Sequence, residues 1–167
     1  KHFDIYFAQD GETLTEFTAK AAEDAVASIQ NTLNYRLNSR VTLIIYNSQN
    51  EFQETNVIDQ YLSEGIQGFT ELFKNRVVIQ FTGSYKQYRH LIHHELVHAV
   101  MNDMFYGGSI QNIISNNITL QFPLWFSEGL AEYEALGWDV DTDMFIRDAS
   151  VSEYLPEINQ LNGYFAY

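Results

Sequence analysis

The sequence predicts an α+β fold: a small mixed β-sheet with a long N-terminal helix, followed by a helical second half. Two observations predict it. Strand-like patterns of alternating or β-branched apolar residues lie in the first 81 residues, and helical periodicity dominates from residue 84 onward. The length of 167 residues suits one domain, because a chain near 150 residues buries about 68–70% of the surface that it exposes when unfolded. We therefore expect residues 1–167 to form a single domain.

The first half combines strand patterns with one long helix. Residues 2–7 alternate polar and apolar side chains, which predicts a half-buried strand. Residues 12–38 carry an apolar side chain at every fourth position, which predicts a long helix. Residues 41–46 are β-branched and apolar, as is typical of an interior strand. Residues 67–72 and 76–81 flank a short turn, and we expect them to form a hairpin.

Helical patterns fill most of the second half. Ser84 is a suitable N-cap for a helix that Gly107 ends, and the fixed φ of Pro123 suits a first helical turn. The predicted helices span residues 84–105, 110–116, 123–137 and 143–149, with one short helical piece within 47–65.

The composition is acidic and contains no cysteine. Nine Lys and Arg residues stand against 22 Asp and Glu residues, which gives a formal net charge of −13. Because nucleic acids and anionic membranes are bound by clusters of Lys and Arg, we expect neither as a partner. The lack of cysteine excludes disulfides, thiolate catalysis and Cys-ligated zinc. No apolar run approaches the roughly 18–20 residues of a membrane span, so we expect no membrane insertion.

One short motif, His94-Glu95-Leu96-Val97-His98, points to metal chemistry. Four helical residues return to within about 40° of the starting direction, so the two imidazoles stack one turn apart and can bind one Zn²⁺ ion. Glu95 is rotated by about 100° from His94, so it can reach a water molecule at the metal and act as a general base. His90, one turn before His94, is an alternative ligand, but it brings no adjacent acid in the position of the base.

A later helix offers a third ligand. Catalytic zinc usually has three protein ligands and one open position that holds water. Glu128 and Glu132 lie four residues apart in the helix predicted over 123–137, so they share one face. We expect Glu128 to be the third zinc ligand, and Glu132 to accept the N–H of a ligand histidine and fix its tautomer. Gly129 has no Cβ and would let this helix lie close to the histidine helix.

These motifs resemble a known group of enzymes. The pair His94 and His98 is followed 30 positions later by Glu128 in Trp125-Phe126-Ser127-Glu128-Gly129-Leu130-Ala131-Glu132-Tyr133, which resembles the gluzincin zinc metallopeptidases. The tryptophan-led helix is similar to that of their aminopeptidase N-type branch, and the whole chain resembles the small bacterial "peptidase MA-like" domains. The resemblance implies a thermolysin-like catalytic fold with a helical zinc-binding subdomain. It also implies one zinc ion held by His94, His98 and Glu128, with Glu95 catalytic.

The resemblance has consequences for partners and location. It implies a peptide or protein substrate. Related domains continue past a segment like Gly163-Tyr164-Phe165-Ala166-Tyr167, so we expect the C-terminal tail of the domain to be missing from this sequence. We also expect further domains in the full-length chain. Such domains usually act outside the cytoplasm, so we expect a periplasmic, secreted or surface location.

Weaker candidates lie outside the histidine motif. Tyr154 and Arg147 follow the Glu128 helix and could stabilise an oxyanion by a hydrogen bond or by charge. Gly68-Phe69-Thr70 could form an edge strand that pairs with the backbone of an extended substrate, or an ordinary hairpin strand. Together with Glu71, this segment loosely resembles the Gly-x-x-Glu segment by which aminopeptidases hold a substrate amine.

The sequence therefore predicts a zinc-dependent metallopeptidase that hydrolyses peptide bonds through a zinc-activated water, with Glu95 as the general base. The alternative is a catalytically inactive, zinc-stabilised interaction module of peptidase ancestry. Glu95 argues against that alternative, because a structural zinc site needs no base. A third hypothesis is a peptidase directed at glycoproteins, since similar spacings occur in mucin-cleaving gluzincins.

Overall fold

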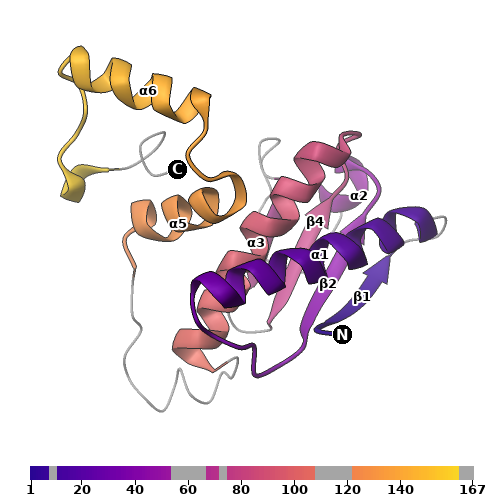
Figure 1. The fold of residues 1–167 in the computed structure, drawn as a ribbon. Helices are drawn as coiled ribbons and strands as arrows, with labels where there is room; N and C mark the ends of the chain where they lie inside the picture. Colours follow the sequence, from indigo (N-terminus) through magenta and orange to yellow (C-terminus); the bar gives the residue numbers. More distant parts are fainter. Residues whose placement is uncertain (8–10, 54–66, 72–74, 108–121, 162–167) are drawn as a thin grey trace. The chain divides into compact units, whose positions relative to one another are not determined.

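The chain forms two compact units, residues 1–120 and 121–167, which a computed structural model shows (Figure 1). Within them the structure describes residues 1–7, 11–53, 67–71, 75–107 and 122–161. All the described strands lie in the first unit, and the described part of the second unit is helical. The predicted α+β class with a small mixed sheet is therefore confirmed.

The sheet has four strands in the order β1-β2-β4-β3. They are β1 (Phe3–Phe7), β2 (Val41–Tyr46), β3 (Gly68–Glu71) and β4 (Arg76–Gln80). Strands β1, β2 and β4 run parallel, whereas β3 is antiparallel to β4, which confirms the predicted hairpin. Strand β2 is interior, as expected, and its alternate side chains are buried: Val41, Leu43 and Ile45. Strand β3 ends the described sheet on one side.

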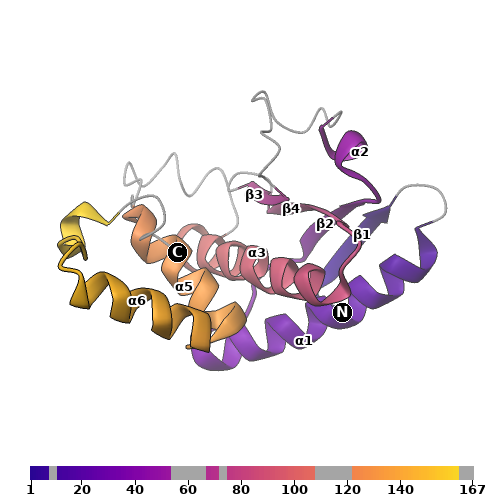
Figure 2. The same ribbon diagram turned by 90° about the horizontal axis from the view of Figure 1, so that it is seen from above.

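Two long helices cover one face of this sheet. Helices α1 (Glu12–Thr32) and α3 (Tyr85–Tyr106) pack against each other and against the strands, as Figure 2 shows from above. Helix α1 makes the crossover that the parallel pair β1 and β2 requires. The short helix α2 (Gln49–Gln53) lies on the other face, where Phe52 packs with Val78.

Helix α1 ends at Thr32, earlier than the predicted end at residue 38. Asn34 has φ 48°, the left-handed conformation that often ends a helix. The following loop is bound to α3: the fully buried Asp103 carboxylate accepts hydrogen bonds from the Tyr35 hydroxyl at 2.9 Å and the Asn38 backbone N–H at 2.7 Å. Apolar side chains of this loop are half-buried, which is why the apolar spacing continues beyond the helix.

The ends of α3 follow the sequence signals. The Ser84 hydroxyl accepts a hydrogen bond from the Gln87 backbone N–H at 3.3 Å, as an N-cap does. Gly107 has φ 62° and donates its N–H to the Asp103 carbonyl at 2.8 Å, which closes the last turn. The prediction of a helix over 84–105 is therefore confirmed to within one residue at each end.

The second unit contains α5 (Leu124–Leu136), α6 (Val140–Val151) and a 3₁₀ turn, η1 (Ile158–Gln160). Pro123 directly precedes α5, close to its predicted place in the first turn. Helix α6 is longer than the predicted 143–149, because Asp139 caps it by accepting the Thr142 backbone N–H at 2.8 Å. The helix predicted over 110–116 lies outside the described residues.

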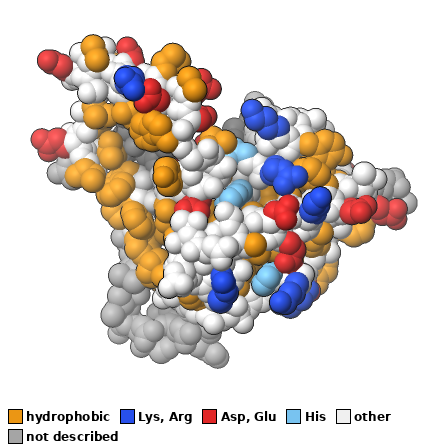
Figure 3. All heavy atoms as spheres, viewed as in Figure 1, with side chains coloured by type: hydrophobic (Ala, Val, Ile, Leu, Met, Phe, Trp, Pro, Cys, Tyr) orange, Lys and Arg blue, Asp and Glu red, His pale blue; other side chains and the backbone are white. Residues whose placement is uncertain are grey.

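Helix α6 exposes apolar side chains, and hydrophobic atoms are prominent at the upper left of Figure 3, where α6 lies. The exposed large apolar residues of α6 are Val140, Met144, Phe145 and Val151. Among the described residues, no helix combines the length and the hydrophobicity needed to cross a lipid bilayer.

Candidate metal centre

Helix α3 holds two histidine rings side by side. The Nε2 atoms of His94 and His98 are 3.2 Å apart, and their ring centroids are 5.0 Å apart. Both side chains are half-buried, whereas Leu96 and Val97 between them are fully buried. The helix therefore turns its apolar residues into the core of the first unit and leaves the two imidazoles on its accessible side.

The separation of the two Nε2 atoms fits a zinc ion. Zinc–nitrogen bonds of 2.0–2.1 Å in tetrahedral geometry place two ligand nitrogens about 3.3 Å apart. The distance of 3.2 Å between the Nε2 atoms of His94 and His98 is close to this value without any change in α3. Imidazole nitrogen is also a donor type that zinc commonly uses. The predicted histidine pair thus has the chemistry and the spacing for two ligands of one ion.

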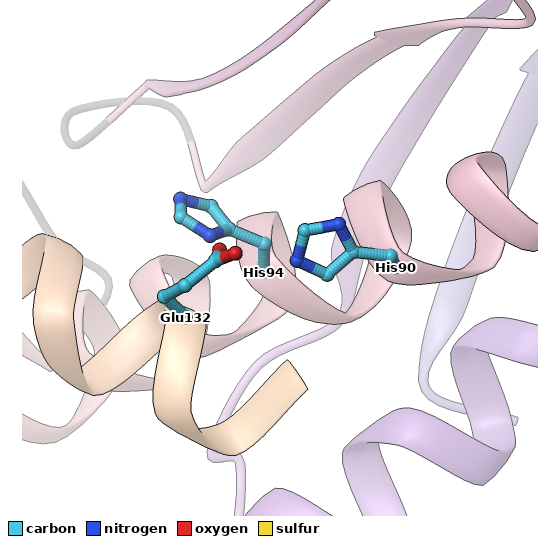
Figure 4. A group of neighbouring side chains, drawn as sticks. All are labelled: His90, His94 and Glu132. Atoms are coloured by element: carbon cyan, nitrogen blue, oxygen red, sulfur yellow. The ribbon is translucent and has the colours of Figure 1, made fainter. Parts of the chain in front are cut away.

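The other two histidines of α3 are less well placed. The ring centroids of His90 and His94 are 6.2 Å apart, wider than in the His94–His98 pair, although Figure 4 shows both rings projecting from α3. His93 is in neither of the groups of described side chains that could hold a metal ion. Burial, with the neighbouring His90 and His94, lowers its pKa. Geometry therefore favours His94 with His98 over His90 with His94 as the ligand pair.

Glu95 lies on a different side of α3 from the two imidazoles. Its side chain is turned toward β3 and is buried, with 7% of its surface exposed. The Thr70 hydroxyl donates toward the Glu95 Oε2 at 2.7 Å and toward the Glu95 backbone carbonyl at 3.0 Å. A buried carboxylate needs such donors to remain charged. Sequence reasoning placed Glu95 correctly on the helix but missed its contact with Thr70.

Strand β3 packs closely on α3, which brings the Thr70 hydroxyl within hydrogen-bond distance of Glu95. A Cβ on Gly68 would lie 3.1 Å from Ile79 Cγ2, 3.1 Å from Leu91 Cδ1 and 3.2 Å from Glu95 Cγ. A larger residue would force these side chains or β3 itself to give way. The glycine two positions before Thr70 was thus the sequence signal that the strand lies close against the helix.

The predicted substrate-binding segment splits between the two faces of the sheet. Gly68 and Thr70 face α3, because side chains two apart on a strand point the same way. Phe69 faces the other way and packs against Phe52, with ring centroids 5.8 Å apart. The side chains of these three residues therefore do not form one surface. Only the backbone edge of β3 is shared by all three.

The second unit carries the two predicted carboxylates. Glu128 and Glu132 are half-buried and lie one turn apart on one face of α5, as expected; Figure 4 shows Glu132 on that helix. Carboxylate oxygen, like imidazole nitrogen, is a donor type that zinc uses, so Glu128 and Glu132 have the chemistry of metal ligands.

Both predicted oxyanion stabilisers bind carboxylates close by in sequence. The Arg147 Nε donates to Asp143, one turn earlier on α6, at 2.5 Å. The Tyr154 hydroxyl donates to the Asp148 carboxylate, and this hydrogen bond raises the pKa of Tyr154. Each group already interacts with an acid that would compete with an oxyanion. Their assignment to catalysis stays a prediction.

Comparison with known proteins gives one finding. A sequence model described as the Peptidase MA superfamily matches residues 21–167. No curated protein and no solved structure matches the chain significantly.

Proposed function

The chain belongs to the Peptidase MA superfamily, and from this premise we propose that it is a zinc-dependent metallopeptidase of the gluzincin type. The observation that carries the proposal is the 3.2 Å separation of the Nε2 atoms of His94 and His98. It gives a His-Glu-x-x-His helix a preformed pair of zinc donors. The substrate class is a peptide or protein.

The proposed zinc ligands are His94, His98 and Glu128. Support for Glu128 comes from its ligand type, from its half-buried position on α5 and from its resemblance to the third ligand of gluzincins. Two neutral imidazoles and one carboxylate leave a net positive charge on the centre. A zinc ion bound there would polarise the substrate carbonyl and acidify a water molecule.

Glu95 supplies the proton transfers. Its carboxylate takes one proton from the attacking water as the oxygen bonds to the carbonyl carbon. It then gives that proton to the amide nitrogen as the carbon–nitrogen bond breaks, so that the leaving group departs as a neutral amine. The same carboxylate is restored at the end of the cycle.

Two further groups have proposed supporting roles. Glu132 would accept the N–H of a ligand histidine and fix the tautomer that leaves Nε2 free to bind the metal. The backbone edge of β3 would pair with an extended substrate, because β3 lies at one end of the described strand order. Backbone pairing of this kind does not depend on the side chain of Phe69.

The second candidate function is a zinc-stabilised interaction module without turnover. A structural zinc site is usually closed by a fourth protein ligand and has no use for a general base. Glu95 is buried, and a buried charge is costly to keep without a function. Its presence in the helix that carries the histidine pair favours the enzyme over the module.

Glu95→Gln tests the function directly. The variant should retain zinc at the wild-type stoichiometry and lose peptide hydrolysis, because an amide cannot accept the proton. Glu16→Gln, at an exposed position on α1, is the matched control and should cleave a peptide library at the wild-type rate. Hydrolysis by Glu95→Gln at the wild-type rate would show that the proposed mechanism is wrong.

A further inference from the structure

We propose that Thr70 is a positioning residue for Glu95: its hydroxyl holds the Glu95 carboxylate in the orientation needed for proton transfer. This inference rests on the proposed function. It assigns to Thr70 a side-chain role that is separate from the pairing of the β3 backbone with substrate.

The hydrogen bond involves a buried group. Thr70 Oγ1 lies 2.7 Å from Glu95 Oε2, within the range of a hydroxyl bonded to a charged carboxylate. Glu95 is 7% exposed, so bulk water solvates its carboxylate poorly. A bond to an ionised group in such surroundings is stronger than one between neutral partners in water.

The hydroxyl also restricts how the Glu95 side chain can rotate. Thr70 Oγ1 lies 3.0 Å from the backbone carbonyl of the same Glu95, as well as 2.7 Å from its side-chain oxygen. A single hydroxyl thus lies between the helix backbone and the carboxylate of one residue. Fixing Oε2 against the strand also fixes where the other carboxylate oxygen lies.

Strand β3 is held firmly enough to act as this support. Thr70 pairs with Val77 of β4, and Gly68 pairs with Ile79 in the same ladder. A Cβ on Gly68 would lie 3.2 Å from Glu95 Cγ, so the strand leaves little room for the stem of the glutamate to move toward it. The strand therefore limits the carboxylate at one end and the aliphatic part of the side chain at the other.

A merely structural Thr70 would have different consequences. If the hydroxyl only satisfied the Glu95 carbonyl, its removal would lower stability and leave the catalytic step unchanged. If it orients the carboxylate, its removal should lower kcat with little effect on KM or on zinc affinity. Displacements of about 1 Å in a reacting group can cost about a hundredfold in rate.

The test compares three variants of the zinc-loaded protein. Thr70→Val removes the hydroxyl and keeps the shape, whereas Thr70→Ser keeps the hydroxyl. Thr18→Val is the matched control: it removes a buried hydroxyl that donates to the Leu14 carbonyl at 2.7 Å and contacts the Tyr88 hydroxyl at 2.9 Å. For each variant, kcat, KM and zinc affinity are measured on one peptide, and a crystal structure gives the Glu95 conformation.

We expect Thr70→Val to lose about ten- to a hundredfold in kcat, with KM and zinc affinity within about twofold of wild type. Thr70→Ser should recover most of kcat, and Thr18→Val should keep it. Glu95 should occupy one conformation in Thr70→Ser and several in Thr70→Val. An unchanged kcat in Thr70→Val, or a single unchanged Glu95 conformation there, would overturn the proposal.

The two proposals fail in different ways. A wild-type protein that binds zinc but cleaves no peptide would contradict the proposed function. In that case the crystal structures still test whether Thr70 positions Glu95. An ordered, unmoved Glu95 in Thr70→Val overturns the positioning role, and a disordered Glu95 supports it.

Discussion

The Asp103 carboxylate of α3 accepts a hydrogen bond from the Tyr35 hydroxyl at 2.9 Å and thereby ties the loop after α1 to the helix that carries the histidines. Asp103 is fully buried, and its Oδ2 also accepts the Asn38 backbone N–H at 2.7 Å. This contact lies about one and a half turns beyond His98 on the same helix. It fixes the C-terminal part of α3 within the first unit.

Asp103→Ala should destabilise the fold strongly. The substitution leaves the Tyr35 hydroxyl and the Asn38 N–H without their acceptor, and we expect a loss of about 2–3 kcal/mol in the free energy of unfolding. Chemical denaturation of the zinc-free protein measures it. Asp24→Ala, which removes an exposed ion pair with Arg89, is the control and should cost less than about 1 kcal/mol. Equal losses in the two variants would contradict the role of Asp103.

Because of the hydrogen bond between Tyr35 and Asp103, we expect the free energy of unfolding to fall at alkaline pH. Burial and the hydrogen bond to Asp103 raise the pKa of Tyr35 to about 12, whereas an unfolded tyrosine has a pKa of about 10. The folded protein therefore holds this proton more tightly, so the stabilisation is complete below pH about 10 and is lost as the pH rises from about 10 to 12. Unfolding experiments should show a steeper fall in that window for wild type than for Tyr35→Phe. Parallel curves would count against this assignment.

Gly68→Ala tests the close approach of β3 to α3. The new Cβ would lie 3.1 Å from both Ile79 Cγ2 and Leu91 Cδ1, closer than ordinary van der Waals contact, so these side chains or the strand must give by a few tenths of an ångström. We expect a loss of about 1–3 kcal/mol in the free energy of unfolding, together with reduced peptide hydrolysis because Thr70 moves away from Glu95. A variant as stable and as active as wild type would show that this packing is not needed.

Glu71 forms an ion pair with Arg76, so we expect peptide cleavage that does not require a free amino terminus on the substrate. These residues are register partners in β3 and β4, and the Arg76 guanidinium is bonded to the Glu71 carboxylate. The acid of the Gly-x-x-Glu segment is therefore already neutralised by a cation of the chain. Peptides with free and acetylated amino termini should have kcat/KM values within about threefold of each other, less than the tenfold that about 1.4 kcal/mol represents. A hundredfold preference for the free amine would indicate an aminopeptidase.

The elements of the fold could be predicted where local signals were strong. The β-branched run Val41–Tyr46 and the helix between Ser84 and Gly107 were predicted to within a residue, because burial pattern and caps agree there. The end of α1 could not be predicted, since it depends on Asn34 and on loop bonds to Asp103, which lies far away in sequence.

In the candidate site, too, features set by local sequence could be predicted, whereas contacts between residues distant in sequence could not. The spacing of His94 and His98 follows from helix geometry alone, so the pair was predictable. The hydroxyl of Thr70 reaches Glu95 across 25 residues of sequence, through a strand–helix contact that no local pattern specifies. The contacts of Arg147 and Tyr154 with Asp143 and Asp148 were also missed, although their spacing along α6 and the turn after it made them possible.

We propose that His94 and His98 hold one zinc ion through their Nε2 atoms, with Glu128 as the third ligand. The most direct measurement is anomalous scattering at the zinc edge from crystals of the protein purified with zinc. We expect a single peak about 2 Å from both Nε2 atoms and from a Glu128 carboxylate oxygen, and loss of the peak in His94→Ala and His98→Ala. No zinc in the protein, or a peak away from the two imidazoles, would contradict it.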